Sequence, residues 1–191
     1  MVQNLMAIRW HARGGQGAVT AAKTLAEMAL TKDLFFQAFP EYGPERMGAP
    51  IQCFNRLSPD PISTYCGVSG PEIVVVVDPS LLELVDITKG VPSQGKIIIN
   101  TDEDVETVKK KYGLHNFQVY TIDATTISME ELGRSMPNIP VLGALIKIIR
   151  LLTKEEAAAF LEQAFGKKFP EKVVKSNIAA LARAFEEVRG A

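Results

Sequence analysis

Short apolar runs rich in β-branched residues alternate along this chain with longer segments of helical periodicity. The clearest run, residues 73–77, holds five consecutive β-branched residues between two prolines. Such a run is typical of a strand buried on both faces. Because strand and helix patterns alternate, we predict an α/β fold. It should be a three-layer α/β/α sandwich with a mostly parallel or mixed central sheet, and residues 73–77 should lie near the centre.

The same patterns predict the remaining elements. Helical spacing in the last third indicates a C-terminal helical layer, which completes a single domain spanning residues 1–191. No internal repeat is present. We predict strands at residues 5–10, 35–39, 51–57, 97–99 and 119–122, and helices at residues 18–30, 102–112, 155–165 and 174–188.

A glycine-rich segment joins the first apolar run to the first helical pattern: Arg13, Gly14, Gly15, Gln16 and Gly17. Glycines let the backbone turn sharply and approach a neighbour closely. At a helix N-terminus, unpaired N–H groups and the helix dipole favour an anion by about 0.3 to 1 kcal/mol. The segment matches neither the dinucleotide fingerprint nor the P-loop. The residues alone leave two alternatives, a bound phosphate-sized anion or a tight strand-to-helix turn.

The segment from residue 40 to residue 50 contains too many glycines and prolines for a helix or a strand. It also carries Tyr42, Glu45, Arg46 and Met47, which combine an aromatic ring, both charges and a flexible apolar side chain. This combination favours contact with another protein over exposure to solvent. We therefore predict that these four residues contact a partner.

A third segment, residues 137–144, contains two prolines, an asparagine and two small residues. We predict that Asn138 caps a helix that begins near Pro140. Gly143 and Ala144 would let this helix pack close to another backbone.

Polar side chains follow the predicted strands at their carboxyl ends, the edge at which open parallel sheets bind ligands. Asp78 and residues 100–102 are equally typical of helix N-caps. A lone histidine such as His11 is more often a hydrogen-bonded structural residue than a base or a ligand. We therefore assign no catalytic residue to this edge, whose polar set is His11, Arg13, Asp78, Asn100, Asp102 and Asp123.

Composition narrows the classes of function. The chain carries 21 basic and 22 acidic residues with no basic, aromatic-rich stripe, which argues against nucleic acid. Cys53 and Cys66 are accompanied by only two histidines, so this chain alone can assemble neither a zinc site nor an iron–sulfur cluster. We expect two reduced thiols in the core. The longest apolar stretch is too short to span a bilayer and the first residues are not basic, so we expect a cytoplasmic protein with no membrane partner.

Three of these segments, taken in order, resemble the gamma subunit of 2-oxoacid:ferredoxin oxidoreductases. They are residues 13–17, 42–50 and 138–144, so the resemblance covers nearly the whole chain. The Gly-Ala-Pro sequence at residues 48–50 looks like the pyruvate type. Arg46 and Met47 stand in the reverse order to the usual family pattern.

The resemblance implies a subunit of a complex that converts pyruvate and coenzyme A to acetyl-CoA and CO2 and passes electrons to ferredoxin. Thiamine diphosphate, magnesium and iron–sulfur clusters would then sit on partner alpha, beta and delta subunits, and this chain would be inactive alone. This chain would contribute structural support to the complex and part of the coenzyme A site. Residues 13–17 would face coenzyme A or thiamine diphosphate. Open alternatives are 2-oxoisovalerate or 2-oxoglutarate as the oxoacid, a stand-alone nucleotide-binding oxidoreductase domain, or an interaction module without ligand.

Overall fold

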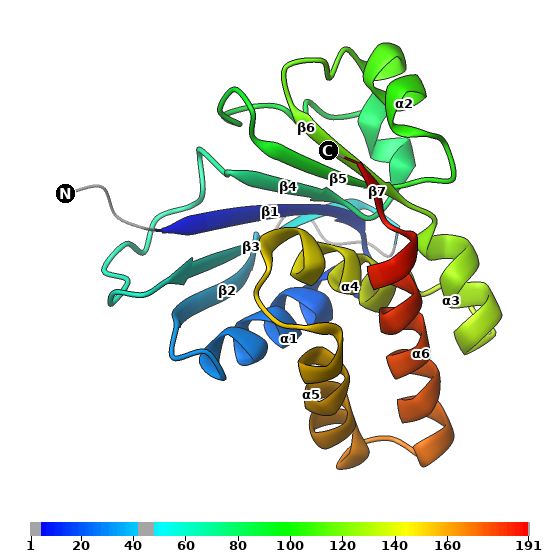
Figure 1. The fold of residues 1–191 in the computed structure, drawn as a ribbon. Helices are drawn as coiled ribbons and strands as arrows, with labels where there is room; N and C mark the ends of the chain where they lie inside the picture. Colours follow the sequence, from blue (N-terminus) through cyan, green and yellow to red (C-terminus); the bar gives the residue numbers. More distant parts are fainter. Residues whose placement is uncertain (1–4, 42–47, 191) are drawn as a thin grey trace.

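The computed structural model describes residues 5–41 and 48–190, which fold around one mixed β-sheet (Figure 1). Within the described residues the sheet has seven strands in the order β2-β3-β1-β4-β5-β6-β7. β4 lies fourth, so the predicted central position of residues 73–77 is confirmed. The strands are β1 Met6–Arg13, β2 Phe35–Glu41, β3 Pro50–Ser58, β4 Ile73–Val76, β5 Lys96–Asn100, β6 Gln118–Ile122 and β7 Arg189–Gly190.

The central strands β1, β4, β5 and β6 run parallel to one another. β3 pairs antiparallel with β1, β2 antiparallel with β3, and β7 antiparallel with β6. The sheet is therefore parallel in the middle and antiparallel at both edges, as the mixed alternative allowed. The carboxyl ends of the parallel strands meet at one edge of the sheet.

Helices cover both faces of the sheet and complete the predicted α/β/α sandwich (Figure 1). One apolar cluster contains residues of α1, α3, α4, α5 and α6, and a second cluster on the opposite face includes a residue of α2. The bounds are α1 Ala18–Leu30, the 3-10 helix η1 Pro79–Glu83, α2 Val105–Tyr112, α3 Ala124–Leu132, α4 Asn138–Ile149, α5 Lys154–Gly166 and α6 Glu171–Glu187. The predicted C-terminal helical layer corresponds to α4, α5 and α6.

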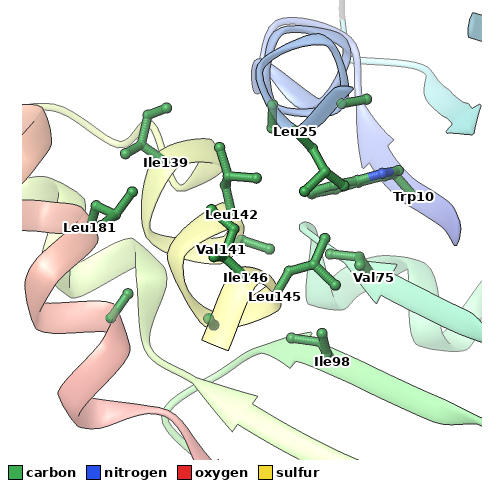
Figure 2. Close-up of a cluster of buried hydrophobic side chains, with 14 of the residues drawn as sticks. Trp10, Leu25, Val75, Ile98, Ile139, Val141, Leu142, Leu145, Ile146 and Leu181 are labelled. Atoms are coloured by element: carbon green, nitrogen blue, oxygen red, sulfur yellow. The ribbon is translucent and has the colours of Figure 1, made fainter. Parts of the chain in front are cut away.

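Helix α4 is the centre of the larger core (Figure 2). It packs against both α1 and α6, and residues Asn138 to Ile146 are buried on every side. Gly143 makes this possible, because a Cβ there would lie 2.9 Å from the Leu181 carbonyl oxygen of α6. The predicted close backbone approach at Gly143 is thus confirmed.

Aspartate caps fix the beginnings of three helical segments. Asp78 accepts a hydrogen bond from the Ser80 N–H, as its N-cap interpretation predicted, and Asp123 accepts one from the Thr126 N–H. Helix α2 begins at Val105 rather than at residue 102, because Asp104 and not Asp102 supplies its cap. Within the described chain no helix meets the length and hydropathy needed to cross a membrane.

Near β1 and β3, the second face of the sheet is covered by loops that two buried arginines hold in place. Arg9 donates to the Lys89 and Ile87 carbonyls at 2.9 and 2.8 Å, and Arg56 donates to the Cys66 and Gly67 carbonyls. Cys53 is buried, and burial raises its pKa to about 12, whereas Cys66 is exposed. The expectation of two core thiols is therefore wrong for Cys66, which lies on a loop that follows β3.

His11 is buried beside Arg9, whose Nε donates to His11 Nε2 at 2.9 Å. Burial first, and the Arg9 charge second, lower the pKa of His11 to about 4. Between this value and the ordinary value of about 6.5, the unfolded chain binds a proton that the folded chain does not. Stability should therefore fall as the pH drops through this window, by about 3 kcal/mol in total.

The test is the free energy of unfolding by urea at pH 7, 6, 5 and 4. We expect His11→Gln, which keeps an acceptor for Arg9, to lack this component of the pH dependence. His115→Gln at an exposed position is the matched control and should retain it. Equal pH dependence in the His11 and His115 variants would contradict the prediction.

Candidate functional site

The glycine loop, residues 13–17, lies at the carboxyl edge of the sheet between β1 and α1. Gly15 has φ +96° and Gly17 has φ +78°, conformations that side chains strongly disfavour. Gly17 is the N-cap of α1, and no side chain caps this helix. The first turn of α1 carries no acidic residue. The positive end of the helix dipole is thus left without a side-chain counter-charge of its own.

Three of the loop's backbone N–H groups, those of Arg13, Gly14 and Gln16, are hydrogen-bonded within the protein. Gly14 donates to the Ala49 carbonyl at 2.9 Å and accepts from Gly48 at 3.2 Å, and Gln16 donates to the Arg13 carbonyl. The two bonds between Gly14 and residues 48–49 continue the β1–β3 ladder past its end, and the Gln16 bond closes a local turn. The Gly14 N–H is therefore not open to a ligand, contrary to the sequence interpretation. Among the described residues, the backbone N–H groups of Gly15 and Gly17 have no acceptor.

A side-chain network joins this loop to the loop after β4. Gln16 accepts from the Arg13 N–H at 2.8 Å and donates to Asp78 at 2.6 Å. The Arg13 guanidinium donates to Ser80 Oγ at 2.8 Å and to the Gly48 carbonyl at 3.0 Å. The network fixes the loop against both β4 and the residues preceding β3.

Arg13 and Asp78 form an ion pair with Nε and Oδ2 3.5 Å apart. Burial alone would raise the pKa of Asp78, but hydrogen bonds from Ser80 and Gln16, together with the Arg13 charge, lower it overall. Asp78 is therefore ionised at neutral pH and offsets much of the Arg13 charge. The positive field at the loop then comes from the helix α1 N-terminus and from cations farther away.

Asn138 lies against the glycine loop, although the sequence predicted it to be a helix cap. Helix α4 begins at Asn138 itself, and its N-cap is Pro137. The Asn138 side chain packs where a Gly17 Cβ would stand, so that a Cβ would lie 2.7 Å from Asn138 Nδ2. The residue is only 4% exposed. Gly17 is thus required by the proximity of Asn138 as well as by its φ angle.

Asn138 also lines a cavity of about 250 Å³ between α1, the segment before α4, and α5 and α6. The aromatic pair Phe165 and Phe169 contributes a wall, with ring centroids 5.4 Å apart. Three exposed cations surround it, and among the described residues none of the three forms an ion pair; they are Lys23, Arg134 and Lys168. One acidic residue, Glu27, lines the cavity as well, so the charge around it is net positive.

The structure brings together only part of the predicted polar edge. Arg13 and Asp78 meet in the network, whereas His11 is enclosed beneath the loops of the second face, and the buried Asn100 bonds the Val77 carbonyl. Tyr42, Glu45, Arg46 and Met47 lie outside the described residues, so their contact role stays a prediction. Ser80 was missed, and its place two residues after the capping Asp78 was the available signal.

The described residues contain no group of three or more His, Cys, Asp or Glu side chains placed to hold a metal ion. The strand after α1 is β2, which pairs with β3 and not with β1. A dinucleotide-binding unit requires the strand that follows the helix to continue the parallel sheet at a neighbouring position. The topology therefore disfavours the stand-alone dinucleotide interpretation.

Comparisons with known proteins agree with this architecture. The family described as pyruvate ferredoxin/flavodoxin oxidoreductase matches residues 7–187. Pyruvate synthase subunit PorC of Thermotoga maritima is 44% identical over 95% of this chain and 94% of its own. The common gamma subunit of pyruvate/ketoisovalerate oxidoreductases of Pyrococcus abyssi is 40% identical over 97% of this chain and 98% of its own length. A crystal structure of pyruvate oxidoreductase subunit PORC from Thermotoga maritima superposes with a TM-score of 0.84, at 40% identity and 98% coverage of both chains. The chain belongs to the pyruvate ferredoxin/flavodoxin oxidoreductase family.

Proposed function

We propose that this chain is the gamma subunit of a pyruvate:ferredoxin oxidoreductase, acting with alpha, beta and delta subunits and with ferredoxin as electron acceptor. The observation that carries the proposal is the end-to-end similarity to the Thermotoga maritima subunit. The similarity covers 95% of this chain and 94% of that subunit. The free thiols of Cys53 and Cys66 accord with a cytoplasmic location, where thiols stay reduced.

We propose further that the glycine loop and the adjoining cavity contribute to the coenzyme A site. Coenzyme A carries phosphates, and the uncapped N-terminus of α1 is a favourable place for one. The cations Lys23, Arg134 and Lys168 line the same cavity as Asn138 and add charge of the required sign. Thiamine diphosphate, magnesium and iron–sulfur clusters would be held by the partner subunits.

The first test is activity with and without the partner subunits. We expect the purified chain alone to show no pyruvate-dependent reduction of a viologen dye. The complex reconstituted with its own partner subunits should show coenzyme A-dependent reduction. Turnover of pyruvate by the chain alone would contradict the proposal. The reconstituted complex is also assayed with 2-oxoisovalerate and 2-oxoglutarate, and faster turnover of either would move the substrate assignment from pyruvate.

The variant Arg13→Ala tests whether the glycine loop contributes to coenzyme A binding. The change leaves the glycines in place but removes a charge and leaves Asp78 uncompensated beside the α1 N-terminus. We expect the Michaelis constant for coenzyme A to rise about ten- to a hundredfold in the reconstituted complex, the scale of one charge-assisted contact. Thiamine diphosphate affinity should stay unchanged. The reverse pattern would assign the loop to thiamine diphosphate, and no change in either would leave it a structural turn.

Asp78→Asn separates the two ways in which Arg13 can act. If the Arg13→Ala effect comes from an uncompensated Asp78, the double variant should recover most of the coenzyme A affinity. If Arg13 contacts a phosphate directly, the double variant should remain impaired. Melting temperatures of all three variants control for loss of the Gln16 and Ser80 bonds to Asp78.

A further inference from the structure

A groove of about 830 Å³ lies at the amino ends of the parallel strands, at the edge of the sheet opposite to the glycine loop. We call it the amino-edge groove. It is formed where β1, β3, β4 and β5 meet the turn after α1 and the turn after α4. Its apolar lining includes Met6, Leu34, Leu57, Ile73, Ile149 and Leu151.

Three large apolar side chains near Leu34 in the sequence are also exposed, although none of them lines the groove. Leu30 at the end of α1 is 60% exposed, and Phe35 and Phe36 at the start of β2 are 47% and 39% exposed. β2 is also the edge strand of the sheet. Phe35 and Phe36 are successive residues of β2 and point to opposite faces, so they add exposed apolar surface on both sides of this edge strand.

The charged residues of the groove are predominantly basic. Glu72 has one carboxylate oxygen engaged by the Ala7 N–H at 2.6 Å, and Lys32 pairs with Glu156. Lys96 and Arg150 also line the groove, and among the described residues neither forms an ion pair. Arg150 ends α4 with φ +54°, a conformation that glycine adopts more readily. An arginine at such a position carries a cost that glycine would avoid.

We propose that the amino-edge groove docks an extended segment of another subunit of the oxidoreductase. Apolar side chains of that segment fill the groove, and its carboxylates meet Lys96 and Arg150. A second copy of this chain fits less well, because a two-fold contact through this surface would bring the same cations toward one another. The proposal rests on membership of a complex and not on the coenzyme A assignment.

The experiment measures affinity of the full chain for the complex that lacks it, by surface-immobilised binding at low salt. The test variant is Lys96→Gln/Arg150→Gly. The glycine suits the Arg150 backbone, so this variant should fold as well as the unchanged chain. The control is Lys110→Gln/Lys172→Gln, which removes the same charge from exposed positions on α2 and α6.

We expect the groove variant to bind about tenfold more weakly, mainly through slower association, with the difference shrinking at high salt. The control should bind normally. Equal affinity of the groove variant, the control and the unchanged chain, at unchanged melting temperature, would overturn the proposal. At saturating chain the Michaelis constant for coenzyme A should be unaffected, which separates this test from that of the glycine loop.

A second measurement identifies the occupant. A photo-crosslinking residue in place of Ser93, an exposed position on the groove, should form an adduct with a peptide of another subunit that contains acidic and apolar residues. An adduct found only within the same chain, or only with a second copy of it, would overturn the proposal.

Discussion

Val75→Asp is expected to prevent folding of this chain. Val75 is fully buried in β4, the central strand, with β1 on one side and β5 on the other. Its side chain lies in the core beneath α4, beside Leu145 and Ile98 (Figure 2). A carboxylate there has no partner, and burying it costs several kcal/mol against a total stability of about 5 to 15 kcal/mol.

The measurement is the yield of folded protein and its thermal unfolding by circular dichroism. Leu84→Asp is the matched control, since Leu84 is 61% exposed and should tolerate the same carboxylate. We expect the control to melt near the unchanged chain while the Val75 variant is recovered aggregated or unfolded. A Val75→Asp protein that melts normally would mean that β4 is not buried in the centre of the sheet.

The elements that the sequence predicted well are those with a strong periodic pattern. Helix α1 covers residues 18–30 as predicted, because alanines and leucines mark its buried face and a glycine precedes it. The predicted runs at residues 73–77, 97–99 and 119–122 correspond to the parallel strands β4, β5 and β6. They could be recognised because a strand buried on both faces is apolar along most of its length. For these helices and strands, the local hydrophobic pattern was sufficient to predict the element.

Other elements could not be predicted from local pattern. Helix α3 reads Ala-Thr-Thr-Ile-Ser at its start, and such residues favour helices only weakly, so packing against α6 has to stabilise it. β7 is two residues long and exists through its pairing with β6. The position of β3 between β1 and β2 also depends on pairing between strands that are distant in sequence. The hydrophobic periodicity of a segment carries no information about such pairing.

In the glycine loop, too, some features follow from the local sequence and others depend on distant contacts. Its position between a strand and a helix followed from the residues, and the structure confirms it. The Gly14 N–H donates to the Ala49 carbonyl, and Asn138 packs against Gly17. Both contacts involve residues far from the loop in sequence, so the local pattern could not predict them. Because of these two contacts, described parts of all three segments that carry the resemblance lie at the carboxyl edge of the sheet.

Gly17→Val is expected to destabilise the protein by about 2 to 4 kcal/mol, for two reasons that can be measured separately. The first is the backbone, because a β-branched residue strongly disfavours φ +78°. The second is space, because the new Cβ would stand 2.7 Å from Asn138 Nδ2 and 2.9 Å from Asn138 Cγ. Coenzyme A binding by the reconstituted complex should weaken as well if the ligand approaches this turn.

Gly15→Val is the matched control, because Gly15 also has a positive φ but a Cβ there would meet nothing within 4 Å. Its loss of stability should therefore reflect the backbone alone and be the smaller of the two. Asn138→Ala in the Gly17→Val background removes the colliding amide, so urea unfolding should show part of the lost stability restored. In the Gly15→Val background the same change should restore nothing. Equal losses for both glycine variants, with no recovery from Asn138→Ala, would mean that Asn138 does not constrain Gly17.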